Sequence, residues 1–112
     1  MELGLESEVL DNWTVLKVKG EVDIYTAPTF RAELIRLIEQ GGNQLVLDLL
    51  GVDFMDSSGL SVLISGKKRT SESQGDLRLV CVDGPVRKIL NVTGLDKVFS
   101  IHPSVQDATQ TN

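Results

Sequence analysis

Two adjacent serines, Ser57 and Ser58, follow an aspartate in the stretch FMDSSGLSVLISGKKR, residues 54–69. The apolar residues before them are typical of a buried strand, and those after them recur at helical spacing. A helix that begins where a strand ends leaves backbone N–H groups without partners. A hydroxyl at that point can cap the helix, act as a nucleophile or carry a modification. The remaining sequence has to distinguish these three roles.

A nucleophilic serine needs a neighbouring base, and His102 is the single histidine among the 112 residues. It stands in the segment IHPS near the C-terminus, far along the chain from both serines. The G-x-S-x-G spacing of hydrolases is also absent, because Met55 and Asp56 occupy the positions where that motif requires glycine. We therefore predict that the protein is not an enzyme and that His102 is an ordinary surface or loop residue.

Metal and nucleotide sites find little support in the sequence. There is no cluster of cysteine and histidine, no G-x-x-x-x-G-K-[ST] and no G-x-G-x-x-G. Three carboxylates, Asp48, Asp53 and Asp56, fall around one predicted strand end and could attract a divalent cation, although solvated loop carboxylates are far commoner. We predict no cofactor and no metal.

Charge and hydropathy exclude further classes of partner. The net charge of −5 removes the attraction to phosphate on which nucleic-acid binding depends. No apolar stretch approaches the roughly 20 residues that span a bilayer, and the N-terminus MELGLESEVL lacks the features of a signal peptide. Cys81 is the single cysteine, which fits a reducing compartment. These features predict a cytoplasmic protein without a nucleic-acid or membrane partner.

Strands and helices alternate on both sides of the serines, after a hairpin-like first region. Two-residue alternation or apolar runs predict strands at 13–19, 44–50, 76–82 and around 98–100. Helical spacing predicts helices that begin near Thr26, at the serines, at Pro85 and near Ser104, with a frayed tail TQTN after them. In the second helix, Leu60, Leu63 and Ile64 are predicted to face the core.

The alternation favours an α/β fold in one domain that covers residues 1–112, with a core at about 4–109. Helices between successive strands act as crossover connections in a parallel or mixed sheet. We predict a mixed sheet of about four to five strands with about four interleaved helices. The serines then lie where one inner strand passes into a covering helix.

A helix cap is the simplest role for these serines, and one cap contributes about 1 kcal/mol. One serine is enough for that, so the other is free to face solvent beside Gly59, which would let a partner approach closely. A phosphate at a helix N-terminus is tolerated by the fold. It would add nearly two negative charges to a surface expected to hold Asp23, Asp53 and Asp56. This arrangement predicts a binding switch without a folding switch.

Three stretches resemble the anti-sigma factor antagonists, the free-standing STAS domains of bacterial partner-switching pathways: GEVDIYTAPTFR, LVLDLLGVDFMDSSGLSVL and LRLVCVDGPVRKILNVTGLDKVFSI. They occur in the right order and cover nearly the whole chain. The resemblance implies that the unphosphorylated protein binds a serine-kinase anti-sigma factor and thereby releases a sigma factor. It also implies that the kinase phosphorylates the antagonist, which ends the complex, and that a PP2C-type phosphatase restores it.

The D-S-[ST]-G-L pattern in the middle stretch is the most specific part of the resemblance, and it implies the roles of the two serines. Ser57, the first serine after the aspartate, is the implied phosphate acceptor. Ser58 is the implied helix cap or a secondary phosphorylation site. The family usually has glycine where this chain has Ser61, so the first turn of this helix is expected to be less open.

The resemblance also implies a partner-binding surface around the acceptor. Asp23 of the GEVD segment matches a position that the family uses at this surface. The complete predicted set is Asp23, Asp56, Ser57, Ser58, Gly59 and Leu60. The alternative is a STAS interaction module of a signalling scaffold or transporter complex that works without sigma-factor control.

Overall fold

The computed structural model describes residues 3–110. These residues form a single mixed sheet with helices packed against it. Within these residues five strands lie in the order in which they occur along the chain. The first two strands form an antiparallel hairpin, and each later strand runs parallel to the strand before it. The strands are β1 (Leu3–Leu10), β2 (Trp13–Val22), β3 (Gln44–Met55), β4 (Asp76–Val80) and β5 (Ser100–His102).

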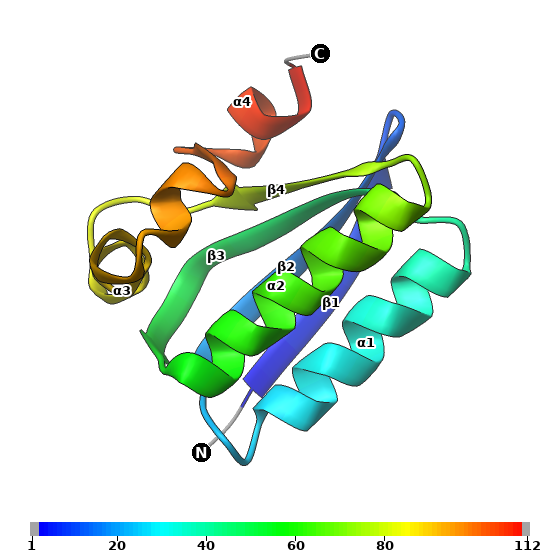
Figure 1. Ribbon diagram of the computed structural model, residues 1–112. Coiled ribbons are helices and arrows are strands. Elements are labelled where there is room, and N and C mark those ends of the chain that lie inside the picture. The colour runs from blue at the N-terminus through cyan, green and yellow to red at the C-terminus, as the bar shows by residue number, and fades with distance from the viewer. Residues whose placement is uncertain (1–2, 111–112) are drawn as a thin grey trace.

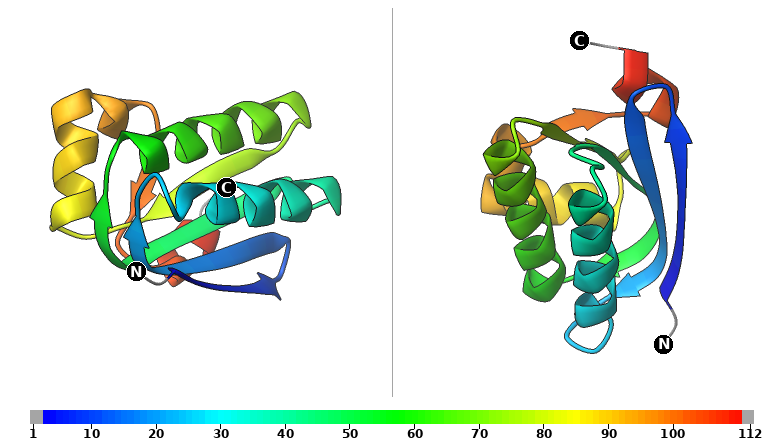
Figure 2. Two further views of the ribbon diagram at one scale, coloured as in Figure 1. Left: turned by 90° about the horizontal axis from the view of Figure 1, so that it is seen from below. Right: turned by 90° about the vertical axis from the view of Figure 1, so that its right-hand side faces the viewer.

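The parallel pairs are possible because a helix connects each of them. The connecting helices are α1 (Ala27–Glu39), α2 (Ser57–Glu72) and α3 (Pro85–Thr93), and a short α4 (Val105–Gln110) follows β5. α1 and α2 lie side by side on one face of the sheet (Figures 1 and 2). The predicted α/β fold, with a mixed sheet and interleaved helices, is confirmed.

Two hydrophobic clusters lie on opposite faces of the sheet, because successive strand residues point to opposite sides. The larger cluster joins α1 and α2 to the sheet through residues such as Leu16, Phe30 and Leu47. The smaller cluster contains Val15 and Val46 beneath Ala108 of α4. The sheet therefore has one face that α1 and α2 cover and one face that α4 covers in part.

Several predicted boundaries change in the structure. The strand predicted at 13–19 continues to Val22, and the one predicted at 76–82 ends at Val80. The last strand was expected around 98–100 but runs from Ser100 to His102, because a 3-10 turn at Leu95–Lys97 occupies the preceding residues. Of the expected frayed tail, Thr109 and Gln110 belong to α4, and the remainder lies outside the described residues.

The prediction of which α2 residues face the core is partly wrong. Leu60 and Leu63 are buried, but Ile64 is 48% exposed and Val62 is buried in its place. The reason is the close packing of α2 against α1 at Gly66, where a Cβ atom would lie 2.7 Å from Leu34 Cδ2. Val62 and Gly66 therefore share the inward face of α2.

Candidate functional site

The carboxyl ends of β2 and β3 lie side by side, and this edge of the sheet holds the two serines. The strands are parallel neighbours that pair Val22 with Met55. Just beyond this pair, the Asp56 N–H donates to the Val22 carbonyl at 3.3 Å. The turn that leads into α1 and the first turn of α2 therefore share one edge of the molecule (Figure 1).

Asp56 caps α2. It has extended backbone angles, and its Oδ1 accepts a hydrogen bond from the Ser58 N–H at 2.8 Å. The prediction that one of the serines caps the helix is wrong, because Ser57 and Ser58 already belong to its first turn. No hydrogen bond between described residues uses either serine hydroxyl. Ser57 is exposed and Ser58 is half-buried, so both hydroxyls remain available for other chemistry.

Gly59 and Leu60 lie in the core, facing the sheet. Gly59 is buried, and a Cβ atom there would lie 2.5 Å from Met55 Cγ and 2.9 Å from Val22 Cγ1. Leu60 is 6% exposed. The expectation that Gly59 opens the surface to a partner is wrong, because the missing side chain lets α2 approach β2 and β3.

Asp23 is also buried, and its carboxylate organises the turn before α1. Its Oδ1 accepts hydrogen bonds from the N–H groups of Tyr25 at 2.9 Å and Thr26 at 3.0 Å. In return, the Thr26 hydroxyl oxygen accepts from the Asp23 N–H at 2.9 Å. The hydrogen bond from the Thr26 N–H is the main cause that lowers the pKa of Asp23 below its ordinary value. Asp23 thus shapes this surface from within, as a positioning residue.

The turn that Asp23 holds presents two large apolar side chains to solvent. Ile24 is 69% exposed and Tyr25 is 83% exposed. Phe54, two residues before Asp56, is 46% exposed. Sequence reasoning missed all three residues, although their signal was present: Ile24 and Tyr25 stand between a strand and a helix, outside the period of either. Exposed aromatic and aliphatic side chains at the edge of the sheet that leads to Ser57 are typical of a surface that binds another protein.

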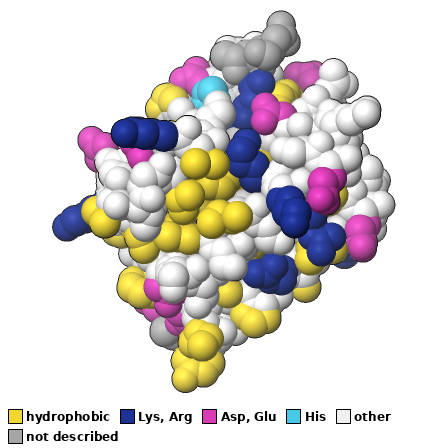
Figure 3. All heavy atoms as spheres, in the orientation of Figure 1, with side chains coloured by type: hydrophobic (Ala, Val, Ile, Leu, Met, Phe, Trp, Pro, Cys, Tyr) yellow, Lys and Arg dark blue, Asp and Glu magenta, His cyan; other side chains and the backbone are white. Residues whose placement is uncertain are grey.

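A groove of about 480 Å³ runs between α1 and the start of α2. Arg31 of α1 crosses it, and its Nη2 atom donates to Ser61 Oγ at 3.4 Å. Figure 3 shows hydrophobic side chains gathered on the helical face of the molecule, with Lys and Arg side chains beside them. The lining consists of Ile24, Ala27, Pro28, Arg31, Ala32, Ile35, Ser58 and Ser61.

The carboxylates predicted around the serines differ in environment. Asp53 is exposed and Asp56 is half-buried. Asp48 lies in the middle of β3, is 7% exposed and accepts a hydrogen bond from the Leu50 N–H at 3.1 Å, so it is not a solvated loop residue. Within residues 3–110, no group of three or more His, Cys, Asp or Glu side chains could hold a metal ion. The acidic surface near Ser57 therefore consists of Asp53 and Asp56.

The family assignment follows from comparison with known proteins. The model of the STAS domain family matches residues 5–108. The chain belongs to the STAS domain family. An anti-sigma-B factor antagonist of Bacillus subtilis (strain 168) is 29% identical over 110 residues, which cover 98% of this chain and 100% of that protein.

Two solved structures extend the comparison of this STAS domain. An anti-sigma factor antagonist from Mycobacterium paratuberculosis has a TM-score of 0.88 at 30% identity, over 96% of this chain and 91% of that one. The Bacillus cell fate determinant SpoIIAA in its phosphorylated form has a TM-score of 0.71 at 23% identity, over 96% of each chain, which is a likeness of fold. The predicted resemblance to anti-sigma factor antagonists is confirmed, and none of these three relatives is named as an enzyme.

His102 of this STAS domain does not approach the serines. It lies on β5, which β4 separates from β3, and its Nε2 atom is 2.7 Å from Ser100 Oγ. The serines at the start of α2 and the histidine on β5, which a hydrolase would have to bring together, therefore lie on separate elements. In the described part of the chain, no helix is long and apolar enough to cross a membrane.

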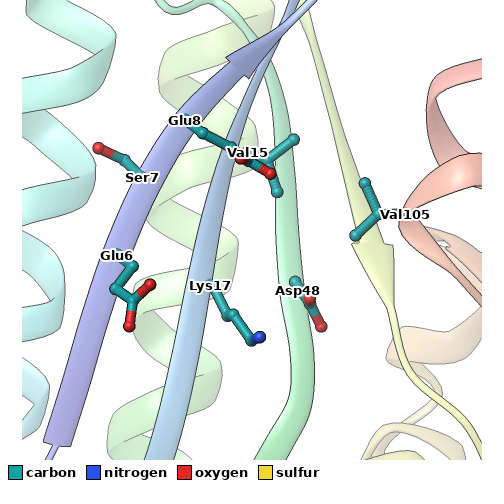
Figure 4. Close-up of a pocket in the computed structure, with 7 residues that line it drawn as sticks. All are labelled: Glu6, Ser7, Glu8, Val15, Lys17, Asp48 and Val105. Atoms are coloured by element: carbon teal, nitrogen blue, oxygen red, sulfur yellow. The ribbon is translucent and has the colours of Figure 1, made fainter.

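A second concavity, of about 260 Å³, lies on the sheet face that α4 covers in part. Figure 4 shows Glu6, Lys17 and Asp48 on the adjacent strands β1, β2 and β3. They are cross-strand partners, since Glu6 pairs with Lys17 and Lys17 pairs with Asp48. Glu6 and Lys17 are exposed on this face, whereas Asp48 is buried. Ser57 lies at the carboxyl edge of the sheet, so this concavity is separate from the serine site.

Proposed function

We propose that this STAS domain is an anti-sigma factor antagonist that is switched by phosphorylation of Ser57. The observation that carries the proposal is the exposed Ser57 hydroxyl at the first position of α2, where Asp56 supplies the cap. The names of the relatives from Bacillus subtilis and Mycobacterium paratuberculosis support the antagonist role. A protein of the same fold that occurs in a phosphorylated form supports the switch.

In the unphosphorylated state, the partner is a serine-kinase anti-sigma factor, and its binding to this protein releases a sigma factor. The docking surface consists of the exposed side chains of Ile24, Tyr25 and Phe54, together with Ser57. Asp23, Asp56 and Gly59 hold this surface in place from below. Both proteins act in the cytoplasm.

Phosphorylation transfers the γ-phosphoryl group of ATP to Ser57 Oγ and adds nearly two negative charges to this surface. A partner that covers Ile24 and Tyr25 would have to strip water from the phosphate, which is costly in an apolar contact. The fold is retained because the phosphate stands at the positive end of a helix. Removal of the phosphate by a PP2C-type phosphatase restores binding.

The test uses the full chain as bait in lysate of its host. Wild type and Ser57→Ala are expected to retain an ATP-binding anti-sigma kinase, and Ser57→Asp is expected to lose it. Ser71→Asp is the matched control, because it adds the same charge at an exposed position in the last turn of α2. Phosphosite mapping on the wild type is expected to find phosphate on Ser57.

Retention of the same partners by all of the baits, with Ser57 unmodified, would contradict the proposal. That result would favour the second candidate, a STAS interaction module in a signalling scaffold or transporter complex. Circular dichroism of Ser57→Asp excludes unfolding as the cause of lost binding. A fall in Tm of about 10 °C, which corresponds to about 2.4 kcal/mol for a domain of this size, would indicate that the variant is destabilised.

A further inference from the structure

The first strand, β1, forms an edge of the sheet, and within residues 3–110 only β2 pairs with it. Figure 2 shows β1 at the rim of the sheet, and its residues from Glu6 to Leu10 are all exposed. Antiparallel strands alternate between pairs that exchange two hydrogen bonds and pairs that exchange none, so every second residue of β1 turns its backbone N–H and C=O groups away from β2. An unpaired edge of this kind is a template to which another extended chain can add.

The hairpin turn identifies the residues whose backbone groups face outward. A turn of two residues joins Leu10 to Trp13, and the pair that closes such a turn is hydrogen-bonded. Along β1, the residues at odd positions therefore belong to the pairs without hydrogen bonds. The residues that face outward are Leu3, Leu5, Ser7 and Val9.

A hollow lies beside β1 on each face of the sheet. One is the concavity of about 260 Å³ described above, where Glu6 and Glu8 stand on the face that α4 covers in part (Figure 4). The other, of about 300 Å³, is lined by Val9 of β1 and Leu37 of α1. When a strand adds to an edge, its successive side chains point alternately to the two faces. Each set of side chains of an added strand would therefore meet a hollow of its own.

The hollow on the α4 side attracts cations. Its lining holds the carboxylates of Glu6, Glu8 and Asp48 against one basic side chain, Lys17, and β1 itself carries no basic residue. A lysine or arginine of an added strand opposite Glu6 or Glu8 would form a favourable cross-strand pair. A second copy of this chain would instead bring its own acidic β1 to the edge, and like charges across strands are unfavourable.

The hollow on the α1 side suits apolar side chains. Val9 is 71% exposed there, and Leu5, on the same face of β1, packs against the main hydrophobic cluster. Arg36 also lines this hollow, but its Nη2 atom lies 2.6 Å from Glu33 Oε2, so its charge is already paired. Valine or a similar side chain of an added strand would cover Val9 and remove apolar surface from water.

We propose that the free edge of β1 binds, by strand addition, an extended segment of a partner protein in which basic and apolar residues alternate. The outward backbone groups of β1 supply the hydrogen bonds, while Glu6 and Glu8 select the basic residues and Val9 selects the apolar ones. β2 lies between β1 and β3, the strand that precedes Ser57. The edge is thus a second interaction surface, separate from the one that Ser57 controls.

The test uses the full chain and a synthetic peptide of alternating lysine and valine with blocked ends, as long as β1 at 8 residues. Two N-methylated forms of this peptide carry the methyl groups on the valine amides or on the lysine amides. Only one of these sets of amides can face β1, so we expect the two affinities to differ by at least about tenfold in isothermal titration calorimetry. Saturation with the unmodified peptide should slow amide hydrogen exchange of Leu5, Ser7 and Val9 at least about fivefold.

Variants of β1 test the contribution of each group. Glu6→Gln combined with Glu8→Gln should weaken peptide binding at least about threefold. The matched control, Glu72→Gln with Asp83→Asn, changes the charge equally at exposed positions outside β1 and should leave the affinity unchanged. Ser7→Pro removes one outward N–H and leaves the bonds to β2 in place, so it should weaken binding at least about tenfold.

Absence of binding, or equal affinities of the two N-methylated peptides, would overturn the proposal. Equal weakening by the control pair would also overturn it, because general charge attraction would then explain the binding. Protection of the same amides that rises with protein concentration in the absence of peptide would show that a second copy occupies the edge, against the proposal. If Ser7→Pro fails to fold, the N-methylated peptides still decide with the unmodified protein. No kinase takes part in these measurements, so their failure leaves the Ser57 switch untouched.

Discussion

Asp56 rather than Ser58 should control the stability of the start of α2. Asp56→Ala removes the acceptor that lies 2.8 Å from the Ser58 N–H, a loss worth about 1 kcal/mol for a typical helix cap. It also removes a negative charge from the helix N-terminus, which adds about 0.3–1 kcal/mol. The sum is about 1–2 kcal/mol, and for a domain of this size it lowers Tm by about 4–8 °C.

The assay is thermal and urea unfolding at pH 7, followed by circular dichroism. Asp56→Asn keeps an oxygen acceptor and loses the charge, so it should lower the free energy of unfolding by the smaller electrostatic amount. Ser58→Ala is the matched control and should change stability by less than about 0.5 kcal/mol, since its hydroxyl makes no hydrogen bond to another described residue. A loss in Ser58→Ala as large as that in Asp56→Ala would refute the assignment of Asp56 as the cap.

Three further predictions concern residues around the serines. Gly59→Ala should destabilise the fold by up to about 2 kcal/mol in urea unfolding, because crowding against Met55 outweighs the better helix propensity of alanine; an unchanged midpoint would contradict the close packing. The lowered pKa of Asp23 means that its carboxylate stabilises the fold above the ordinary value of 3.8 and that this contribution is lost as the pH falls further. The stability gap between wild type and Asp23→Asn should therefore shrink from pH 7 to pH 3, and a constant gap would argue against the carboxylate. Tyr25→Ala should leave Tm nearly unchanged and weaken partner capture, because Tyr25 is 83% exposed, and full retention of the partner would exclude it from the docking surface.

The start of α2 was predicted at the right residues, but its cap and the rotation of the helix were not. The apolar run before Ser57 and the helical spacing after it placed the junction between β3 and α2 correctly, because periodicity reports which residues face a core. The cap could not be assigned in this way. Asp, Ser and Ser occupy consecutive positions that all favour a helix start, and the choice depends on which backbone first adopts helical angles. Ile64 was misplaced because the spacing of apolar residues does not show how a helix is rotated by its neighbours.

The predicted partner-binding residues separate into two groups for the same reason. Ser57 is exposed as the pattern implied, but Asp23, Gly59 and Leu60 are buried. A motif identifies residues that a site requires, and it does not say whether each one touches a partner or supports a residue that does. Ile24 and Tyr25 lie outside the predicted set, although the buried carboxylate of Asp23 holds the turn that exposes them.

The sequence by itself determined the class of fold, the order of most strands and helices, and the position of the serines at the junction of a strand and a helix. These features follow from local periodicity, turn residues and charge, which act over a few neighbouring positions. The tertiary structure decided which side chain caps α2, which residues of the motif are buried, and that Arg31 of α1 reaches Ser61 of α2. The cap depends on the residue at which the backbone first adopts helical angles. The burial of the motif residues and the contact between Arg31 and Ser61 depend on segments far apart in the chain, which Gly59 and Gly66 allow to pack closely.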